Sequence, residues 1–495
     1  MSRDKIYTLL AALAVALTLA SCGSPVPSGA EKVDALPAIY PDYAGVVIPA
    51  EIAPMNFSFT GGECDHVYVK IVGSKGGEMT SGGKTIDLDI DEWHALTSQN
   101  AGGTLTFTLS VEQDGKWREF KEFSMTVSED PLAEWGLTYR LIAPGYEAFS
   151  SVGLYQRELS TFCESPIIKN TQIAYGCVNC HTANKTNPDQ MTFHIRGDNG
   201  GTLIQKDGHQ EILKARSDVL GGSMVYPYWH PSGDYCAFST NNTHQGFHTV
   251  RGKRIEVFDS ASDVFVYDTR THELLTDSLL STPDHWETYP AFAPDGKSLY
   301  FCSAREIEPM FTRYNEVRYD ICRIAFDPAT GTYGNSVDTL FRSSAMGKSA
   351  VHPRPSYDGR FLMFTLSAYG CFPIWHADAD NWILDLATGE AHPLTQANSQ
   401  ASDGFHNWST NSRWAVFTSR RDDGLYTRLY IAHIDAAGQA SKPFLLPQRD
   451  PKMYYDDLMF SYNTPDFTCK PVNLDARQTG IDIMSNRRVN TKIRN

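Results

Sequence analysis

The sequence predicts an all-β protein built from two domains, an N-terminal β-sandwich and a larger ring of β-sheets. Three observations support this prediction. Apolar and polar residues alternate with period two before residue 130, Asp-Gly pairs mark tight turns, and one motif recurs in register after residue 131. The chain of 495 residues is longer than one typical domain and can bury more than one core.

The first domain is predicted over residues 41–130, where short strands show one apolar face. One such face is formed by Val67, Val69 and Ile71. A second run carries apolar residues at 105, 107, 109 and 111, and Asp114-Gly115 then turns the chain into a further strand. The spacing favours a small immunoglobulin-like sandwich. A spacer and a binding module would look alike here, and we expect a spacer.

An eight-residue motif recurs in the second domain. Copies lie at residues 226–233, 289–296 and 352–359, with a degenerate copy at 405–412. Each copy leads into one strand and then a second, and the period of roughly 50 to 60 residues matches a β-propeller blade. We therefore predict a propeller over residues 131–475, followed by a C-terminal tail of residues 476–495.

Two further blades are expected to be irregular, which gives six blades in total. Residues 202–204 and 210–213 would supply part of one. The other would combine residues 154–162 with residues 457–462, so that both ends of the domain close the ring.

The motif resembles the repeat of TolB-like, WD40-like β-propellers of bacterial envelopes, over about residues 190–470. In such a repeat the proline precedes the innermost strand, the aromatic residue packs between blades and Asp-Gly forms the hairpin. The resemblance implies that the residues beginning each innermost strand meet at the mouth of the central channel; these are Tyr226, Tyr289, His352 and His406. These residues could bind a peptide or small ligand. Alternatively they have no binding role, because this position is polar in most propellers.

The run from Cys177 to His181 has the pattern Cys-Xaa-Xaa-Cys-His, which is typical of covalent haem attachment. Cys177 and Cys180 would form thioethers with the two vinyl groups, and His181 would be the proximal iron ligand. We expect one haem c. The motif is predicted to lie on an inserted loop of residues 165–200 that leans on the propeller.

Two other readings of this motif remain open. Cys177, Cys180 and His181 could bind zinc with a distant fourth ligand, or the thiols could form a disulfide or redox pair. For a haem, the distal ligand would be Met191 or His194, or the iron would stay five-coordinate. His376, Asp378 and Asp380 resemble a metal cluster, but a solvated loop accounts for them better.

The N-terminus predicts export and lipid attachment. A basic start and an apolar stretch lead to Leu-Ala-Ser-Cys, which resembles a bacterial lipobox. We predict a signal peptide of residues 1–21, lipidation of Cys22 and a tether of residues 22–40, with the protein anchored in the outer membrane on the periplasmic side. Haem c is attached outside the inner membrane, so export and the haem motif agree.

The formal net charge of −15 argues against nucleic acid as a partner. The sequence favours an envelope lipoprotein that carries haem c in electron transfer or redox sensing, with a redox protein as partner and no substrate of its own. The alternative is a non-enzymatic propeller scaffold that binds envelope proteins or peptides. An oxidoreductase acting on a small ligand would require an open iron position.

Overall fold

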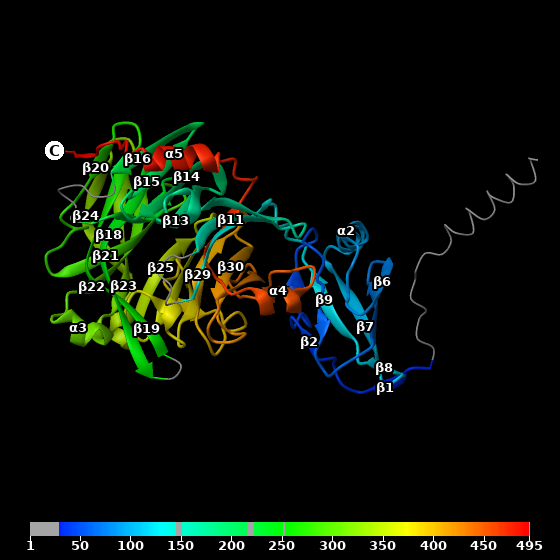
Figure 1. The fold of residues 1–495 in the computed structure, drawn as a ribbon. Helices are drawn as coiled ribbons and strands as arrows, with labels where there is room; N and C mark the ends of the chain where they lie inside the picture. Colours follow the sequence, from blue (N-terminus) through cyan, green and yellow to red (C-terminus); the bar gives the residue numbers. More distant parts are fainter. Residues whose placement is uncertain (1–28, 145–150, 215–221, 251–252, 495) are drawn as a thin grey trace, which may run out of the picture. The chain divides into compact units, whose positions relative to one another are not determined.

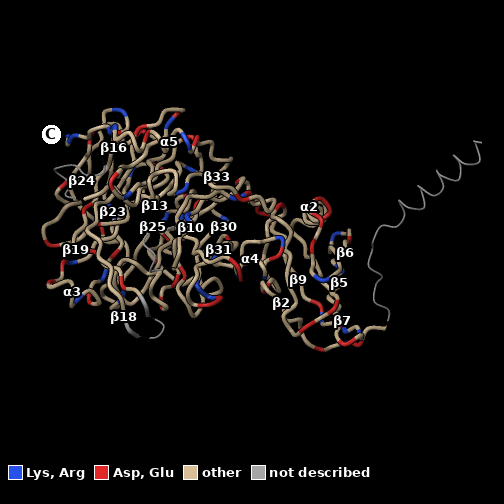
Figure 2. The backbone as a smooth tube through the Cα atoms, in the orientation of Figure 1, with Lys and Arg blue, Asp and Glu red and all other residues tan. Residues whose placement is uncertain are grey.

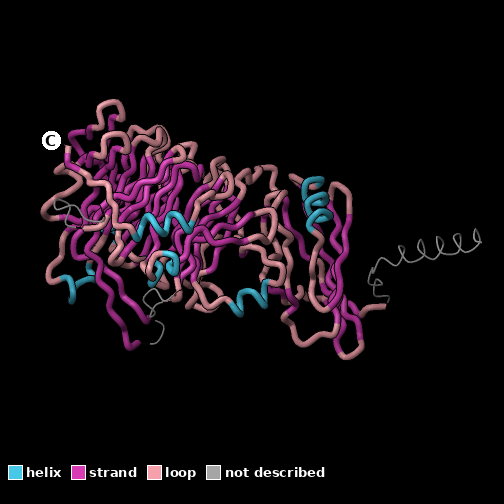
Figure 3. Tube along the Cα trace, turned by 45° about the horizontal axis from the view of Figure 1, so that its top comes forward, coloured by secondary structure: helices cyan, strands magenta, loops and turns pink. Residues whose placement is uncertain are grey.

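A computed structural model describes residues 29–144, 151–214, 222–250 and 253–494. The predicted signal peptide and Cys22 lie outside these ranges. Strands dominate the described residues and helices are few and short (Figure 3). The chain divides into two compact units, one of residues 1–129 with 447–457 and one of residues 130–446 with 458–495.

Unit 1 contains a seven-stranded mixed sheet and a separate two-stranded sheet (Figure 1). Its elements are β1 (Glu31–Val33), β2 (Ile39–Tyr40), β3 (Val47–Ile48), β4 (Ser58–Phe59), β5 (His66–Gly73), β6 (Glu78–Gly83), α2 (Ile90–Gln99), β7 (Gly103–Gln113), β8 (Lys116–Phe120), β9 (Phe123–Val127) and α4 (Pro451–Asp457). The predicted turn at Asp114-Gly115 is confirmed: both residues have positive φ, and Gln113 pairs with Lys116 across it.

The sheet of unit 1 differs from the predicted immunoglobulin-like sandwich. β1 and β3 pair in parallel with β8 and β9, which makes the sheet mixed. Helix α2 was not predicted. It begins at Asp89, whose carboxylate accepts hydrogen bonds from the backbone N–H groups of Asp91 and Glu92, and it buries Trp93 completely. The short capped segment between two strands therefore forms a helix rather than a further strand.

Unit 2 contains six antiparallel sheets of four strands, one of which gains a fifth strand. From the innermost strand outward, blade 1 has β33 (Ser461–Thr468), β10 (Gly136–Ile142), β11 (Val152–Glu158) and β12 (Glu164–Lys169); blade 2 has β13 (Cys177–Asn184), β14 (Asn187–Arg196), β15 (Gly201–Lys206) and β16 (His209–Lys214); blade 3 has β17 (Met224–Trp229), β18 (Tyr235–Val250), β19 (Lys253–Asp268), β20 (Glu273–Leu275) and β34 (Lys492–Ile493).

The remaining three blades follow in chain order. Blade 4 has β21 (His285–Phe292), β22 (Ser298–Arg305), β23 (Tyr319–Asp327) and β24 (Thr332–Phe341); blade 5 has β25 (Ser349–Pro355), β26 (Phe361–Ser367), β27 (Asp380–Asp385) and β28 (Ala391–Pro393); blade 6 has β29 (Asp403–Trp408), β30 (Trp414–Ser419), β31 (Arg428–His433) and β32 (Phe444–Leu445). The short helices are η1 (Asn170–Gln172), α3 (Met310–Arg313), η2 (Tyr314–Glu316), η3 (Ser343–Met346), η4 (Pro373–Trp375) and α5 (Ala476–Met484).

The innermost strands contact one another in a closed cycle. Successive contacts join β13, β17, β21, β25, β29 and β33, and β33 contacts β13 again. This arrangement is consistent with the predicted β-propeller. β33 from the end of the chain pairs with β10 from its beginning, as the predicted ring closure requires. We call the space enclosed by these six strands the central channel.

The innermost strands share a local backbone feature. Each has an irregular register and one non-glycine residue with positive φ, which marks a β-bulge; these residues are Cys180, Tyr226, Tyr289, His352, Phe405 and Thr464. In four of them proline follows at once, after Tyr226, Tyr289, His352 and Thr464. Cys180-His181 and Phe405-His406 hold the same place without proline.

The prediction of an inserted loop over residues 165–200 is therefore wrong. Cys177 to His181 lie on β13, the innermost strand of blade 2, and the neighbouring residues form β12 and β14. The prediction that residues 202–204 and 210–213 belong to a blade is confirmed by β15 and β16 of this blade. Its innermost strand carries no recognisable repeat because His181 replaces the proline. Its hairpin also turns on Lys185 and Thr186, both with positive φ, instead of on the Ser-Gly or Asp-Gly of other copies.

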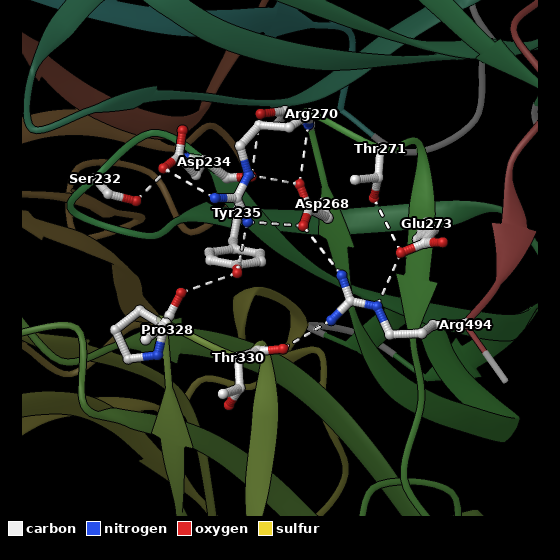
Figure 4. A network of polar contacts seen from close by, with 12 residues as sticks. Ser232, Asp234, Tyr235, Asp268, Arg270, Thr271, Glu273, Pro328, Thr330 and Arg494 are labelled. Carbon is white, nitrogen blue, oxygen red and sulfur yellow. Dashed lines mark hydrogen bonds and ion pairs between the residues drawn. The ribbon is translucent and has the colours of Figure 1, made fainter.

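The predicted C-terminal tail forms α5 and ends in β34, which lies against blade 3. β34 pairs in parallel with β20. The Arg494 guanidinium lies 3.2 Å from Asp268 and 2.9 Å from Glu273, and donates to the Thr330 carbonyl (Figure 4). Asp268 is fully buried and also pairs with Arg270, so the network offsets the cost of burying its charge.

Candidate ligand-binding site in the central channel

The central channel contains a large cavity and a smaller one. The large cavity, which we call the mouth cavity, has a volume of about 440 Å³ and is lined by residues of several innermost strands, including Cys180, Tyr226 and Thr464. The smaller one, the inner cavity, has a volume of about 50 Å³ and shares these three residues. The mouth cavity falls within the roughly 300–1,000 Å³ typical of small-molecule sites.

Both cysteines of the haem motif line the mouth cavity. Cys177 is 1% exposed, and burial raises the pKa of its thiol. Cys180 is half-buried at the bulge of β13. Because the bulge interrupts the regular alternation of side chains, two thiols three residues apart meet the same space.

His181 lies deeper than the thiols and lines the inner cavity. Its imidazole is buried beside Thr138 and Arg140, and neither ring nitrogen makes a hydrogen bond of standard geometry. Burial lowers the pKa of His181 to about 4. The ring is therefore neutral at pH 7, which is the form that binds metals.

The structure does not bring the predicted distal ligands to the cavities. Met191 is 2% exposed and packs in an apolar cluster with Val178 and Phe193. His194 is 1% exposed, and its Nδ1 lies 3.0 Å from the Thr202 hydroxyl. Both belong to β14, the second strand of blade 2, and neither lines the mouth or inner cavity.

The structure places Tyr226 and Tyr289 of the four predicted channel residues at the mouth cavity, and His352 at the inner cavity. Tyr226 and Tyr289 line the mouth cavity, with ring centroids 4.4 Å apart, and His352 lies 4.1 Å from the Tyr289 ring. The residue of blade 6 that matches these three is Phe405, not His406, because Phe405 has the positive φ of the bulge. His406 takes the next place and lines the inner cavity.

Sequence reasoning missed the three arginines that line the mouth cavity. They are Arg140 on β10, Arg196 at the end of β14 and Arg420, which follows β30. None belongs to a recognisable motif, and they are brought together only by ring closure. No Asp or Glu of the described residues lines this cavity.

The other metal-site candidates find no support among the described residues. No group of three or more His, Cys, Asp or Glu side chains in the described ranges is placed to hold a metal ion, and the nine cysteines there are free. His376 pairs with Glu256 at 3.3 Å, not with Asp378 or Asp380.

Within the described ranges, no helix has the length and apolar character to cross a membrane. Lys and Arg are interspersed with Asp and Glu along the described backbone (Figure 2).

Comparison with known proteins gives only distant likenesses. No family model matches the chain, and no curated protein matches it. Similar solved structures include an oligogalacturonate lyase in complex with manganese, with 12% identity, 63% of this chain and 74% of that chain covered and a TM-score of 0.36. A periplasmic gluconolactonase of Pseudomonas aeruginosa has 16% identity, with 68% and 100% covered and a TM-score of 0.34. Prolyl oligopeptidase B from Galerina marginata has 10% identity and a TM-score of 0.34; the match covers 68% of this chain but only 42% of the enzyme. At these TM-scores the likeness carries no information on function.

Replacing His194 with asparagine should change how stability depends on pH. Burial lowers the pKa of His194 to about 3, whereas an unfolded histidine titrates near its ordinary value of about 6.5. The unfolded chain therefore binds the proton at a higher pH than the folded chain does. The free energy of unfolding is highest above about pH 6.5 and decreases as the pH falls toward about 3, the pKa of His194 in the folded protein. Relative to pH 7.5, this loss amounts to about 2 kcal/mol at pH 5.

Urea unfolding at pH 7.5 and pH 5 tests this expectation. The difference in free energy of unfolding between the wild type and His194→Asn should be about 2 kcal/mol smaller at pH 5 than at pH 7.5. His209→Asn is the matched control, because His209 is exposed on the same sheet. An unchanged gap for His194→Asn would contradict a neutral buried imidazole.

Proposed function

We propose that the protein carries one covalent haem c at the mouth cavity and acts in electron transfer or redox sensing, as an envelope lipoprotein with a TolB-like propeller. The observation that supports this most directly is that Cys177 and Cys180 line the same cavity. A haem attached through both thiols needs them to reach one space large enough for the macrocycle. Anchoring would come from Cys22, and the partner would be a redox protein.

The chemistry of the described residues fits a haem in most respects. The mouth cavity has two thiols and walls of aromatic and aliphatic side chains, including Phe372, Trp375 and Phe405. His181 offers a neutral imidazole with unbonded nitrogens, but it lines the inner cavity, not the mouth cavity. A bound haem would supply one-electron chemistry, while the protein holds it and limits the access of water.

A second candidate function is a binding propeller without haem. It is favoured by the register of the motif, because Cys180-His181 occupies the place that Tyr226-Pro227 holds in blade 3. The motif can therefore be read as a variant blade repeat whose side chains contribute to a pocket. In that case the channel would take a free ligand, or the protein would organise envelope proteins or peptides.

Intact mass and absorbance of natively matured protein distinguish the two functions. Haem c predicts a mass increase of one haem and a reduced α-band that survives acid–acetone extraction. A colourless protein with free thiols, or with Cys177 joined to Cys180, would favour the binding propeller.

A further inference from the structure

The mouth cavity is cationic although the protein is acidic. Arg140, Arg196 and Arg420 line it, with no Asp or Glu of the described residues among its walls, in a chain of net charge −15. A channel lined by one sign of charge concentrates ligands of the opposite sign.

Arg196 is the most informative of the three. It is half-buried at the end of β14, and within the described ranges its guanidinium makes no hydrogen bond or ion pair. A guanidinium carries five N–H donors and no acceptor, so one without a protein partner keeps those donors for a ligand. Arg140 donates through Nη2 to Asn463 at 2.6 Å and also hydrogen-bonds the Cys177 thiol, whereas its buried Nε has no partner.

One buried carboxylate stabilises the charge of Arg196 without forming a hydrogen bond to it. Asp259 lies close enough to Arg196 to interact electrostatically, yet it does not line the cavity. Its oxygens accept hydrogen bonds from Thr243 at 2.6 Å and Asn241 at 2.7 Å, and from the Cys371 thiol at 3.4 Å. Arg196 and Arg140 thus keep N–H donors that a ligand can use.

The remaining walls are suited to a flat apolar body. Phe372, Ile374, Trp375 and Phe405 line the cavity, and the Arg420 guanidinium stacks over the Trp375 ring at 4.2 Å. Arg420 is thereby held in place by an aromatic face, whereas Arg140 and Arg196 present free N–H groups.

We propose that the mouth cavity binds a carboxylate-bearing ligand with a flat apolar body, and that Arg196 and Arg140 bind the carboxylate. Guanidinium–carboxylate pairs are strong and geometrically specific, so these residues would orient the ligand in the channel. Two sources share this chemistry. One is the propionates of a haem on Cys177 and Cys180, which rests on the proposed function; the other is a free aromatic carboxylate.

The test uses full-length Cys177→Ser/Cys180→Ser protein, which cannot form thioethers. Mesoporphyrin IX has two carboxylates, no vinyl groups and no iron, and its dimethyl ester keeps the same macrocycle but carries two neutral methyl esters in their place. Quenching of tryptophan fluorescence measures binding of both, and 2-naphthoate against 2-naphthylmethanol repeats the comparison with a smaller body. We expect at least one acid to bind about tenfold or more tightly than its neutral analogue.

Adding Arg196→Gln should weaken binding of the preferred acid by about tenfold or more and leave the neutral analogue unchanged. Arg323→Gln is the matched control, because Arg323 is exposed and pairs with Asp338 on the outer strands of blade 4. Equal binding of acids and neutral analogues, no binding of any probe, or an unaffected but folded Arg196→Gln variant would overturn the proposal.

The outcomes separate this inference from the proposed function. Acid-selective binding that depends on Arg196, together with wild-type protein that matures without haem, supports the carboxylate site and rejects haem c. Binding of mesoporphyrin but not naphthoate identifies the haem propionates as the source, and the reverse identifies a free carboxylate.

Discussion

Ending the chain at Phe460 should abolish cooperative unfolding of unit 2. This truncation removes α5 and β34 together with β33, the innermost strand of blade 1, which pairs along the length of β10. Tyr462 and Phe467 on this strand are completely buried, and loss of each would cost about 3–5 kcal/mol. Together these losses approach the whole stability of a typical domain, about 5–15 kcal/mol.

A polar link across the closure is lost as well. The Asp466 carboxylate accepts a hydrogen bond from Asn407 of blade 6 at 2.8 Å, and from Thr182 and the Ala183 N–H of blade 2 at 3.3 Å. Without β33, blades 6 and 2 lose the strand between them, and the half-buried donors on both sides lose their shared acceptor.

Circular dichroism and thermal unfolding measure the result. A chain ending at Asn490 is the control: it keeps β33 and removes only β34 with the contacts of Arg494, so it should retain one cooperative transition at a lower temperature. Cooperative unfolding of the 460-residue chain with full β content would show that the ring does not depend on β33.

Replacing Cys177 and Cys180 together with serine should eliminate covalent haem. Each thioether requires a thiol, and serine keeps nearly the same volume, so the blade itself should persist. Each single variant should retain one thioether at most and show a shifted α-band. Intact mass and the reduced spectrum after acid–acetone extraction provide the measurement.

Cys163→Ser is the matched control, because Cys163 is exposed and does not line either cavity. It should carry the same haem content as the wild type. Pigment that stays covalently attached in the double variant would rule out these two sulfurs as the attachment sites.

Much of the ring could be predicted because its repeats carry turn chemistry. The copies at Tyr226, Tyr289 and His352 combine a proline with a Ser-Gly or Asp-Gly turn, and those local requirements are visible in a single sequence. β13 escaped detection since it satisfies the same backbone geometry with Cys180-His181. The side chains at a bulge can change without altering the strand pairing. Cys177 to His181, which were predicted to lie on a loop, therefore belong to a strand of a blade.

The charge of the mouth cavity could not be predicted from the sequence. Arg140, Arg196 and Arg420 are far apart in the chain, and each lies on or just after the second strand of its blade. Which of the many strand-end arginines face the channel depends on ring closure; Arg305, at the end of β22, is exposed instead. Local sequence patterns therefore do not predict that these three arginines lie close together.

The path of the chain between β32 and β33 has a consequence for dissecting the protein. After Leu446 the chain contributes residues 447–457, including α4, to unit 1, and only then returns to supply the ring-closing strand. Neither unit is therefore encoded by one uninterrupted stretch of gene. A cut at residue 130 would leave the N-terminal fragment without α4 and would leave residues 447–457 of the other fragment without the unit they belong to. An exchange of one unit between two proteins must therefore include both of its segments.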